Sequence, residues 1–303
     1  MWPRRSYTIL RTSELDARDR RQPMMPRRSA ELVTDAPVKR CLTWVRRLSN
    51  ALVEDLGRLT PALWDGPTNC PPWRVRDLAA HVLSSGEAFV QNIRRGLAGS
   101  VDPPPDAEAN QRRRLELEAA DPTAVVRALA ATTAEFIALY AGLQESQLGA
   151  LCFHRRGNRS VRWYAAHRLA EVAFHAWDVQ LSLGQSPTFD EEVAALLLPT
   201  LLESNAPRTY AAGLSAERGR GERFALAVVD DRSARWLVTI DPDKLDAQRG
   251  DMAADLTITG SAATLALLAY GRLDLPGLAR AGAVQLEGAP ALADRFALVF
   301  PRP

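Results

Sequence analysis

Two histidines and one glutamate are spaced as the ligands of a metal ion would be. Glu171 and His175 lie four residues apart in a stretch with helical periodicity, so both project from one face, about one turn apart. His81 lies in another predicted helix and can supply a third ligand. Three nitrogen or oxygen ligands leave one position of a zinc ion open, which is typical of catalytic sites. The sequence therefore predicts a catalytic divalent-metal site, most suitably for zinc, although nickel, iron and manganese accept the same ligands.

Several nearby residues could support or line this site. Asp178 and Asp77 each lie within one turn of a predicted imidazole ligand, so each is expected to accept a hydrogen bond from it. His167 lies one turn before Glu171 and is rotated by about 80° from the ligating histidine of the same helix. We therefore expect His167 to line the pocket. Cys70 has no histidine or aspartate at a telling spacing and is interpreted as an ordinary loop cysteine.

The same residues also allow a simpler interpretation. An E-x-x-x-H pair arises by chance on arginine-rich helices, and Glu171 could pair with Arg168 while His175 sits in a polar pocket. His81, on an apolar helix face, could equally be a core residue. The immediate neighbours of Glu171 are apolar, however, and a buried glutamate without a partner is costly. We therefore favour the metal site over this simpler interpretation.

Four helices are predicted to position these residues. Apolar side chains recur at three- and four-residue steps, as they do on packed helices, over residues 41–59, 73–95, 122–143 and 160–184. Asp121 followed by Pro122 is typical of a helix start, and Gly184 of a helix end. The stretch 101–114 is charged and proline-rich, and we expect a loop there. These features predict an antiparallel four-helix bundle.

The hydrophobic period changes after about residue 205. Alternating apolar residues over 224–228 and 236–240, with a turn at 230–233, predict a β-hairpin. Further strands are expected near residues 256–258 and 284–286, and helices at 261–271 and 289–296. This half is therefore predicted to be a small α+β domain. The predicted organisation is an arginine-rich disordered lead-in, a helical domain and an α+β domain, at residues 1–35, 36–186 and 205–303.

Composition and charge argue against several functional classes. Residues 1–40 contribute +5 to a net charge of +2, so the rest of the chain sums to −3 and gives no support for nucleic-acid binding. No run of 18 apolar residues exists, so no membrane span is expected. Three widely spaced cysteines, too few for a disulfide framework, favour the reducing cytoplasm. Motifs for nucleotide binding or a serine nucleophile are absent from the sequence.

Three blocks of the sequence, taken in order, resemble the mycothiol-dependent maleylpyruvate isomerase family. They are Trp73–His81, Arg168–Asp178 and Leu256–Arg272. The resemblance implies a DinB-like metal-binding four-helix bundle followed by a domain similar to sterol carrier proteins. It also implies that the metal ligands are the two histidines and the glutamate already singled out.

The resemblance gives two arginines a role. It implies that Arg272 reaches toward the interface between the domains and holds an anionic substrate or the thiol cofactor. By itself, Arg272 would be interpreted as a surface arginine near a helix C-terminus. A second functional arginine of the family lies in the loop after the second helix, where Arg112 is the candidate replacement. This departure weighs against maleylpyruvate itself as the substrate.

The resemblance implies mycothiol as a thiol cosubstrate, and zinc binds thiols in the thiolate form. We therefore expect a metal- and mycothiol-dependent S-transferase that acts on a small electrophile, in detoxification or specialised metabolism. Reversible addition of the thiol would instead give cis–trans isomerisation of a maleylpyruvate-type acid. A non-catalytic metal- or ligand-binding module of the stress response is the alternative from another class, and a metal-dependent hydrolase is a further one. None of these requires a particular oligomeric state.

Overall fold

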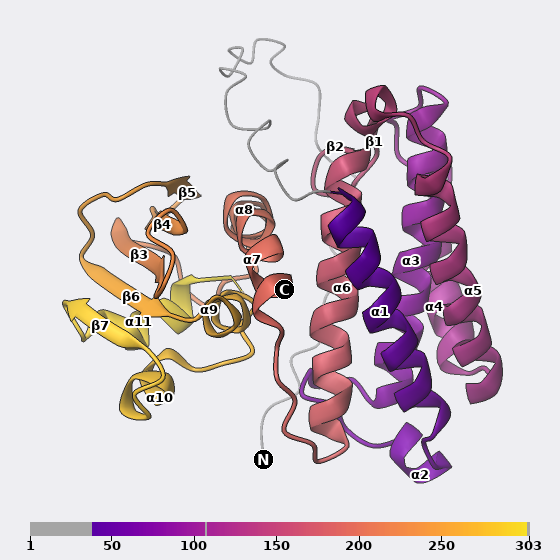
Figure 1. Ribbon diagram of the computed structural model, residues 1–303, viewed down its shortest axis with the longest axis horizontal. Coiled ribbons are helices and arrows are strands. Elements are labelled where there is room, and N and C mark those ends of the chain that lie inside the picture. Colours follow the sequence, from indigo (N-terminus) through magenta and orange to yellow (C-terminus); the bar gives the residue numbers. More distant parts are fainter. Residues whose placement is uncertain (1–37, 107, 302–303) are drawn as a thin grey trace, which may run out of the picture. The chain divides into compact units, whose positions relative to one another are not determined.

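The computed structural model describes residues 38–106 and 108–301 (Figure 1), so the predicted lead-in lies outside the described residues. The first half is a bundle of four long helices, namely α1 (Val38–Gly57), α3 (Val75–Leu97), α5 (Pro122–Ala141) and α6 (Val161–Ser182). Helices α1 and α3 each pack against both α5 and α6. The four predicted helices are thus present, each within a few residues of its expected bounds.

Local capping explains where these helices begin and end. The Asp121 carboxylate accepts a hydrogen bond from the backbone N–H of Ala124 at 3.0 Å and starts α5. The Ser160 hydroxyl accepts from the backbone N–H of Trp163 at 3.2 Å and starts α6. After α6, Gly184 adopts a φ of +72°, a left-handed conformation that glycine accepts without strain.

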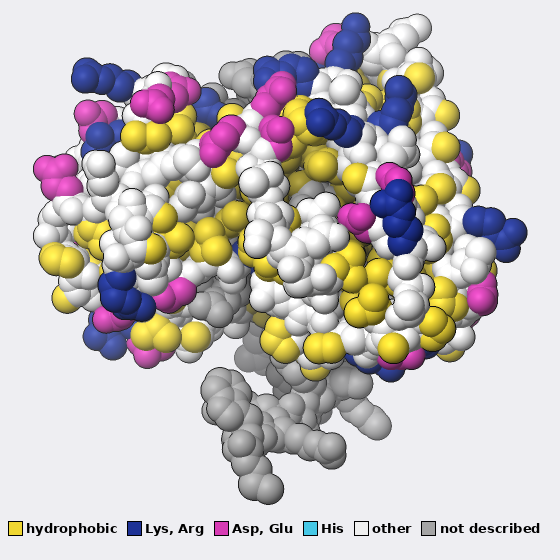
Figure 2. All heavy atoms as spheres, turned by 60° about the horizontal axis from the view of Figure 1, so that its bottom comes forward, with side chains coloured by type: hydrophobic (Ala, Val, Ile, Leu, Met, Phe, Trp, Pro, Cys, Tyr) yellow, Lys and Arg dark blue, Asp and Glu magenta, His cyan; other side chains and the backbone are white. Residues whose placement is uncertain are grey.

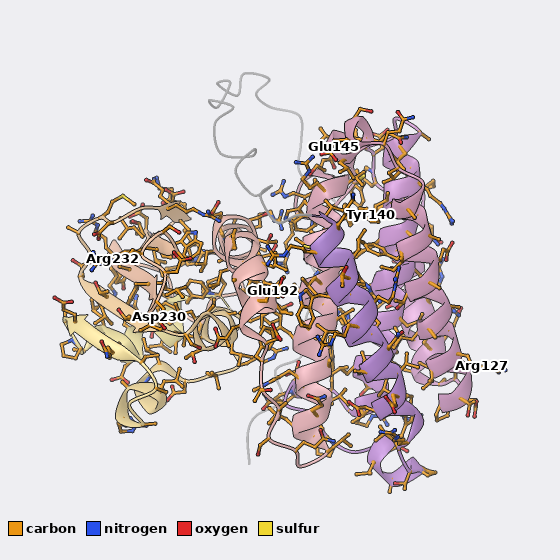
Figure 3. All side chains as sticks on the ribbon, viewed as in Figure 1. Arg127, Tyr140, Glu145, Glu192, Asp230 and Arg232 are labelled. Carbon is orange, nitrogen blue, oxygen red and sulfur yellow. The ribbon has the colours of Figure 1, made fainter. Side chains whose placement is uncertain are left out.

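Helix α6 is buried on almost every side. Its inner face meets α1 and α3, and its outer face is covered by α7 (Glu191–Thr200). Within the bundle, the Tyr140 hydroxyl of α5 donates to the carbonyl of Val161 at 2.6 Å (Figure 3). Burying one large apolar side chain is worth about 1.5–3 kcal/mol, so a helix enclosed in this way is held firmly. Polar side chains carried by α6 are therefore fixed in position.

Helix α5 is long and apolar enough to cross a membrane, judged by length and composition alone. In the fold, its Val125, Leu129 and Phe136 are buried, and the helix packs against α1 and α3. A core helix of a bundle has this same composition.

The first half also contains elements that were not predicted. They are α2 (Pro61–Trp64), α4 (Ala109–Glu118), a 3₁₀ turn (Glu145–Gly149) and a short hairpin of β1 (Leu151–Cys152) and β2 (Arg159–Ser160). The prediction of a loop over residues 101–114 is wrong from residue 109 onward, where helix α4 begins. This helix has no apolar periodicity that would predict it, because it is mostly polar and buries only Leu117, against α3.

The second half contains a five-stranded sheet in the order β5-β4-β3-β6-β7. Its strands are β3 (Glu222–Val228), β4 (Arg235–Ile240), β5 (Leu245–Arg249), β6 (Leu256–Gly260) and β7 (Gln285–Gly288). Strands β3 and β6 are parallel, and the other neighbours are antiparallel. The predicted hairpin is confirmed, with Phe224 opposite Val238. Strand β5 is mostly exposed along one edge of the sheet, so it lacks the apolar alternation that would have revealed it.

Short helices complete this α+β domain. After α7 come a π-helical turn (Leu201–Asn205) and α8 (Ala206–Ala211), and later α9 (Ala262–Ala269), α10 (Leu275–Arg280) and α11 (Leu292–Val299). A cavity lined by Leu268, Phe296 and Phe300 has a volume of about 10 Å³, enough for one water molecule. This part of the interior is therefore filled by side chains. Basic and acidic side chains are interspersed over the face shown in Figure 2.

The contact between α3 and the β1 strand gives a test of the fold. A Cβ atom on Gly96 would lie 2.6 Å from the carbonyl oxygen of Leu151 and 2.9 Å from the Cα atom of Cys152, both backbone atoms. We expect Gly96→Ala to lower the free energy of unfolding by about 1–3 kcal/mol. Gly149→Ala, where a Cβ atom meets open space, is the matched control and should change it little. Equal stability of the two variants in urea unfolding would contradict the close approach of these elements.

Candidate metal centre

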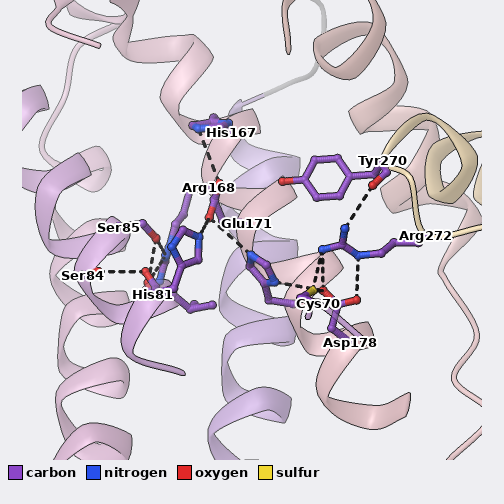
Figure 4. A network of polar contacts seen from close by, with 12 residues as sticks. Cys70, His81, Ser84, Ser85, His167, Arg168, Glu171, Asp178, Tyr270 and Arg272 are labelled. Carbon is purple, nitrogen blue, oxygen red and sulfur yellow. Dashed lines mark hydrogen bonds and ion pairs between the residues drawn. The ribbon is translucent and has the colours of Figure 1, made fainter. Parts of the chain in front are cut away.

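The three predicted ligands meet where α3 packs against α6. His81 Nε2 lies 3.0 Å from Glu171 Oε2, and His175 Nε2 lies 3.9 Å from the same oxygen (Figure 4). The ligand atoms of all three residues lie within 4.8 Å of one another. Glu171 and His175 are buried, whereas His81 is partly exposed. The structure thus gathers this group, which we call the triad, at one point beside the core.

The spacing of the triad suits a small divalent cation. Zinc binds nitrogen and oxygen ligands at about 2.0–2.2 Å, so the ligand atoms of a tetrahedral site are separated by roughly 3.3 Å. The observed separations of 3.0 Å and 3.9 Å bracket this value. A cation held by three such ligands keeps a further position for another molecule.

The ring orientation of His175 is set by a neighbouring carboxylate. Its Nδ1 lies 3.1 Å from Asp178 Oδ2, so Nδ1 carries the proton and the lone pair of Nε2 faces Glu171. Burial lowers the pKa of His175, and this effect outweighs the opposing hydrogen bond to Asp178. Burial thus favours the neutral imidazole, and the hydrogen bond to Asp178 keeps its proton on Nδ1, so Nε2 is free in the form that binds metal.

Glu171 is charged, in contrast to the neutral His175. Burial acts to raise its pKa, but the hydrogen bond from His81 and the nearby His167 and His175 keep that pKa well below its ordinary range. The side chain is therefore an ionised carboxylate in a buried position.

Asp178 is itself held by Arg272 from the C-terminal domain. Arg272 Nε and Nη2 donate to the two carboxylate oxygens of Asp178, each at 2.8 Å (Figure 4). Burial acts to raise the pKa of Asp178, but the hydrogen bonds from His175 and Arg272 lower it to about 2. Arg272 thus fixes Asp178, and through it His175. Its guanidinium is already engaged by this carboxylate.

Cys70 belongs to the hydrogen-bonded network around Asp178, contrary to its interpretation as an ordinary loop residue. Its Sγ lies 3.0 Å from Asp178 Oδ2 and 3.1 Å from Arg272 Nη2. Burial raises the pKa of Cys70 to about 12, more than the positive charge of Arg272 lowers it, so the side chain is a thiol. The partners lie 108 and 202 residues away along the chain, so no local spacing could have revealed the contacts.

Three other predicted site residues lie outside the triad. His167 Nε2 is 3.8 Å from Glu171 Oε1, and its ring stacks on Trp163. Asp77 caps α3 by accepting from the backbone N–H of Arg74 at 2.9 Å, so its carboxylate does not orient His81. Arg112 is exposed on α4 and pairs with the carboxylate of Asp106.

Two residues not assigned to the site lie close to Glu171. Arg168 is fully buried and donates to the carbonyl of Val82 at 2.8 Å, so the alternative hydrogen-bonded pair of Glu171 with Arg168 does not form. Tyr270 stacks on Phe174 with 3.8 Å between ring centroids, and its phenol ring points from the end of α9 toward the triad (Figure 4). Burial raises the pKa of Tyr270 well above its ordinary value, so its hydroxyl stays protonated.

Comparison with known proteins identifies both halves of the chain. Residues 45–180 match the family model described as the mycothiol maleylpyruvate isomerase N-terminal domain. Residues 203–301 match the model of the SCP-2 sterol transfer family. All residues of the triad fall inside the first match, whereas Arg272 falls inside the second.

Individual proteins agree with these matches. Two uncharacterized proteins of Mycobacterium tuberculosis, from strains CDC 1551 and H37Rv, are each 28% identical over 180 residues, which cover 59% of this chain and 78% of theirs. A crystal structure of a mycothiol-dependent maleylpyruvate isomerase matches with a TM-score of 0.61 at 19% identity, covering 89% of this chain and 98% of that chain. This likeness confirms the predicted fold class, a DinB-like bundle followed by an α+β domain.

The buried Asp178 carboxylate gives a prediction about pH. Its pKa lies below the ordinary value of 3.8, so the stability that it contributes is present above pH 4 and is lost as the pH falls toward about 2. Asp178→Asn leaves Arg272 unpaired and should cost roughly 3–5 kcal/mol at pH 7. Its further loss of stability on acidification should be smaller than that of the wild type. The exposed Asp243→Asn control should follow the wild type in thermal unfolding. Parallel acid curves for wild type and Asp178→Asn would contradict the assignment.

Proposed function

The chain belongs to the mycothiol-dependent maleylpyruvate isomerase family, and from this premise we propose that it is a metal- and mycothiol-dependent enzyme acting on small electrophilic molecules. The observation that carries the proposal is the triad. Two imidazoles and a carboxylate lie at metal-ligand spacing, and one of the imidazoles is fixed by Asp178 in its metal-binding tautomer. Three free cysteines are compatible with a reducing cytoplasm, where we propose that the enzyme acts.

In this proposal His81, Glu171 and His175 hold one divalent cation, for which zinc is the best fit to the ligand types. When bound, the cation would supply Lewis acidity that favours the thiolate form of a thiol at its open position. The chain's own residues supply the rest. Asp178 keeps the proton of His175 on Nδ1, and Trp73 covers the ring of His81 with 4.8 Å between ring centroids.

The leading reaction is thiol transfer. The sulfur of the thiol forms a C–S bond with an electrophilic carbon, and the displaced electron pair leaves with a leaving group or takes up a proton. Tyr270, whose hydroxyl remains protonated and whose ring points toward the triad, would donate a hydrogen bond to the charge that develops there. Arg272 acts as a positioning residue, since its guanidinium is committed to Asp178.

A second candidate is cis–trans isomerisation, which the name of the matching family favours. The first step is the same addition of the thiol, which turns a carbon–carbon double bond into a single bond. Rotation about that bond and expulsion of the thiol then give the other isomer. The two candidates differ in the fate of the thiol, because transfer consumes it and isomerisation returns it.

Metal binding tests the ligand assignment without any substrate. We expect His81→Ala and His175→Ala to weaken zinc binding by at least about 100-fold, and Asp178→Asn to weaken it by about 10–100-fold because the orienting hydrogen bond changes. His154→Ala removes a partly buried histidine outside the triad and should bind zinc like the wild type. Competition with a chelator followed by calorimetry measures these affinities. Unchanged zinc affinity in the His175→Ala protein would rule out the triad as the metal site.

Thiol consumption tests the reaction. Zinc-loaded protein, mycothiol and a panel of small electrophiles should give a thiol adduct, at a rate that falls at least about 100-fold in His175→Ala. Maleyl-type acids that isomerise with the thiol fully recovered would favour the isomerase. Turnover without any thiol would indicate a hydrolase. If zinc binds and no thiol-dependent reaction occurs across the panel, the chain is a binding module and the proposed activity is wrong.

A further inference from the structure

Six positively charged or titratable side chains gather around Trp163 and His167, next to the triad. We call them the basic cluster: His154, Arg155, Arg156, Arg159, His167 and Arg208. Four of them lie in the β1–β2 hairpin and its turn, one lies in α6 and one in α8. The sequence alone does not predict an anion site from these residues, because they are scattered over residues 154–208 with no shared spacing.

The cluster is a continuous structure that borders the triad. The His167 ring stacks on Trp163 with 4.3 Å between ring centroids, and the guanidinium carbon of Arg208 lies 4.7 Å from the Trp163 ring centroid. His154 adjoins His167 with 5.6 Å between ring centroids. On the other side, His167 Nε2 lies 3.8 Å from Glu171 Oε1. The basic cluster therefore borders the triad at Glu171.

Among the residues that the structure describes, 38–106 and 108–301, no carboxylate balances the four arginines of the cluster, since none of them forms an ion pair. Arg208 Nε and Nη1 are buried without a hydrogen-bond partner in this part of the chain, and so is His167 Nδ1. Burial and the nearby Arg159 and Arg156 lower the pKa of Arg208 to about 9. Buried donors and like charges held together without a partner are unfavourable unless an anion joins them.

The two acidic groups of the metal centre already have partners of their own. The Glu171 carboxylate accepts from His81 at 3.0 Å and belongs to the triad. Asp178 is occupied by Arg272 and His175. Neutral groups instead hold the arginines in place: Arg156 Nη1 donates to Thr209 Oγ1 at 2.7 Å, and Arg208 Nη2 donates to Asn205 Oδ1 at 2.9 Å. These contacts orient the guanidinium groups without neutralising them.

We propose that the basic cluster is a binding site for a small-molecule oxyanion, a carboxylate or a phosphate, held chiefly by Arg156 and Arg208. Guanidinium groups bind such oxyanions through paired N–H donors, and the unpartnered N–H groups of Arg208 are available for this. A cavity of about 20 Å³ lined by Asn205, Thr209 and Tyr270 adjoins the partners of both arginines. That the oxyanion is part of the electrophilic substrate rests on the proposed function, whereas anion binding itself requires neither metal nor thiol.

Calorimetry on the metal-free, thiol-free full chain tests this site. Malonate and inorganic phosphate are titrated at constant ionic strength, and at least one should bind saturably. Arg156→Gln and Arg208→Gln should each weaken that binding by at least about tenfold. Arg127→Gln removes the same charge from an exposed position on α5 (Figure 3) and should leave it unchanged. Tighter binding of malonate identifies a carboxylate site, and tighter binding of phosphate a phosphate site.

Two calorimetric results would overturn the proposal. One is the absence of saturable binding of both anions, and the other is an equal loss in Arg127→Gln and Arg156→Gln. Thermal unfolding separates binding from a structural role: Arg208→Met should lose the anion-induced rise in Tm, and without anion it should be at least as stable as the wild type. An Arg208→Met protein that keeps the full anion-induced rise also contradicts the proposal. Saturable malonate binding without thiol turnover would contradict the proposed enzymatic function but would support the anion site.

Discussion

The buried carboxylate of Asp178 is the group on which the arrangement of the site depends. A carboxylate without solvent is tolerated only when charged and hydrogen-bonding partners surround it. Here Arg272 supplies two N–H groups, His175 supplies Nδ1, and Cys70 adds a thiol. These partners come from the C-terminal domain, from α6 and from the loop before α3, so three separate segments converge on one pair of oxygens. The position of the His175 ring follows from this convergence.

The charge states of the site follow from the same network. The proton that His175 shares with Asp178 leaves Nε2 free to act as a ligand, and burial keeps the ring neutral. Glu171 stays ionised because His81 donates to it. The α6 helix can hold these unlike groups one turn apart because α1, α3 and α7 enclose it. Tight packing of the helix thus sets the electrostatics that metal binding needs.

The sequence predicted the parts of the fold and site that repeat with a simple period. The four long helices and the hairpin at 224–240 follow from such periods, and the pair Glu171 and His175 follows from helix geometry. Helix α4 and strand β5 were missed because each is mostly exposed and carries little apolar pattern. The positions of Cys70 and Tyr270 depend on tertiary contacts across the chain, which no local spacing encodes.

Supporting groups are harder to predict than ligands for a physical reason. A carboxylate one turn from a histidine can face it, as Asp178 does, or cap its own helix, as Asp77 does. Both geometries satisfy the local rules, and tertiary packing decides between them. Arg272 illustrates the same point, because its sequence context suits a surface position, whereas the fold buries its guanidinium against Asp178.

X-ray absorption spectroscopy of the zinc-loaded protein, with and without mycothiol, tests whether the triad binds a metal that accepts a thiol. Without thiol, we expect only nitrogen and oxygen ligands, at about 2.0–2.2 Å from the metal. Addition of mycothiol should introduce one sulfur at about 2.3 Å, equally in the wild type and in Cys70→Ser. A sulfur ligand that is already present without thiol and is lost in Cys70→Ser would show that the triad is not the complete ligand set. A coordination shell that mycothiol leaves unchanged would show that the metal does not bind the thiol.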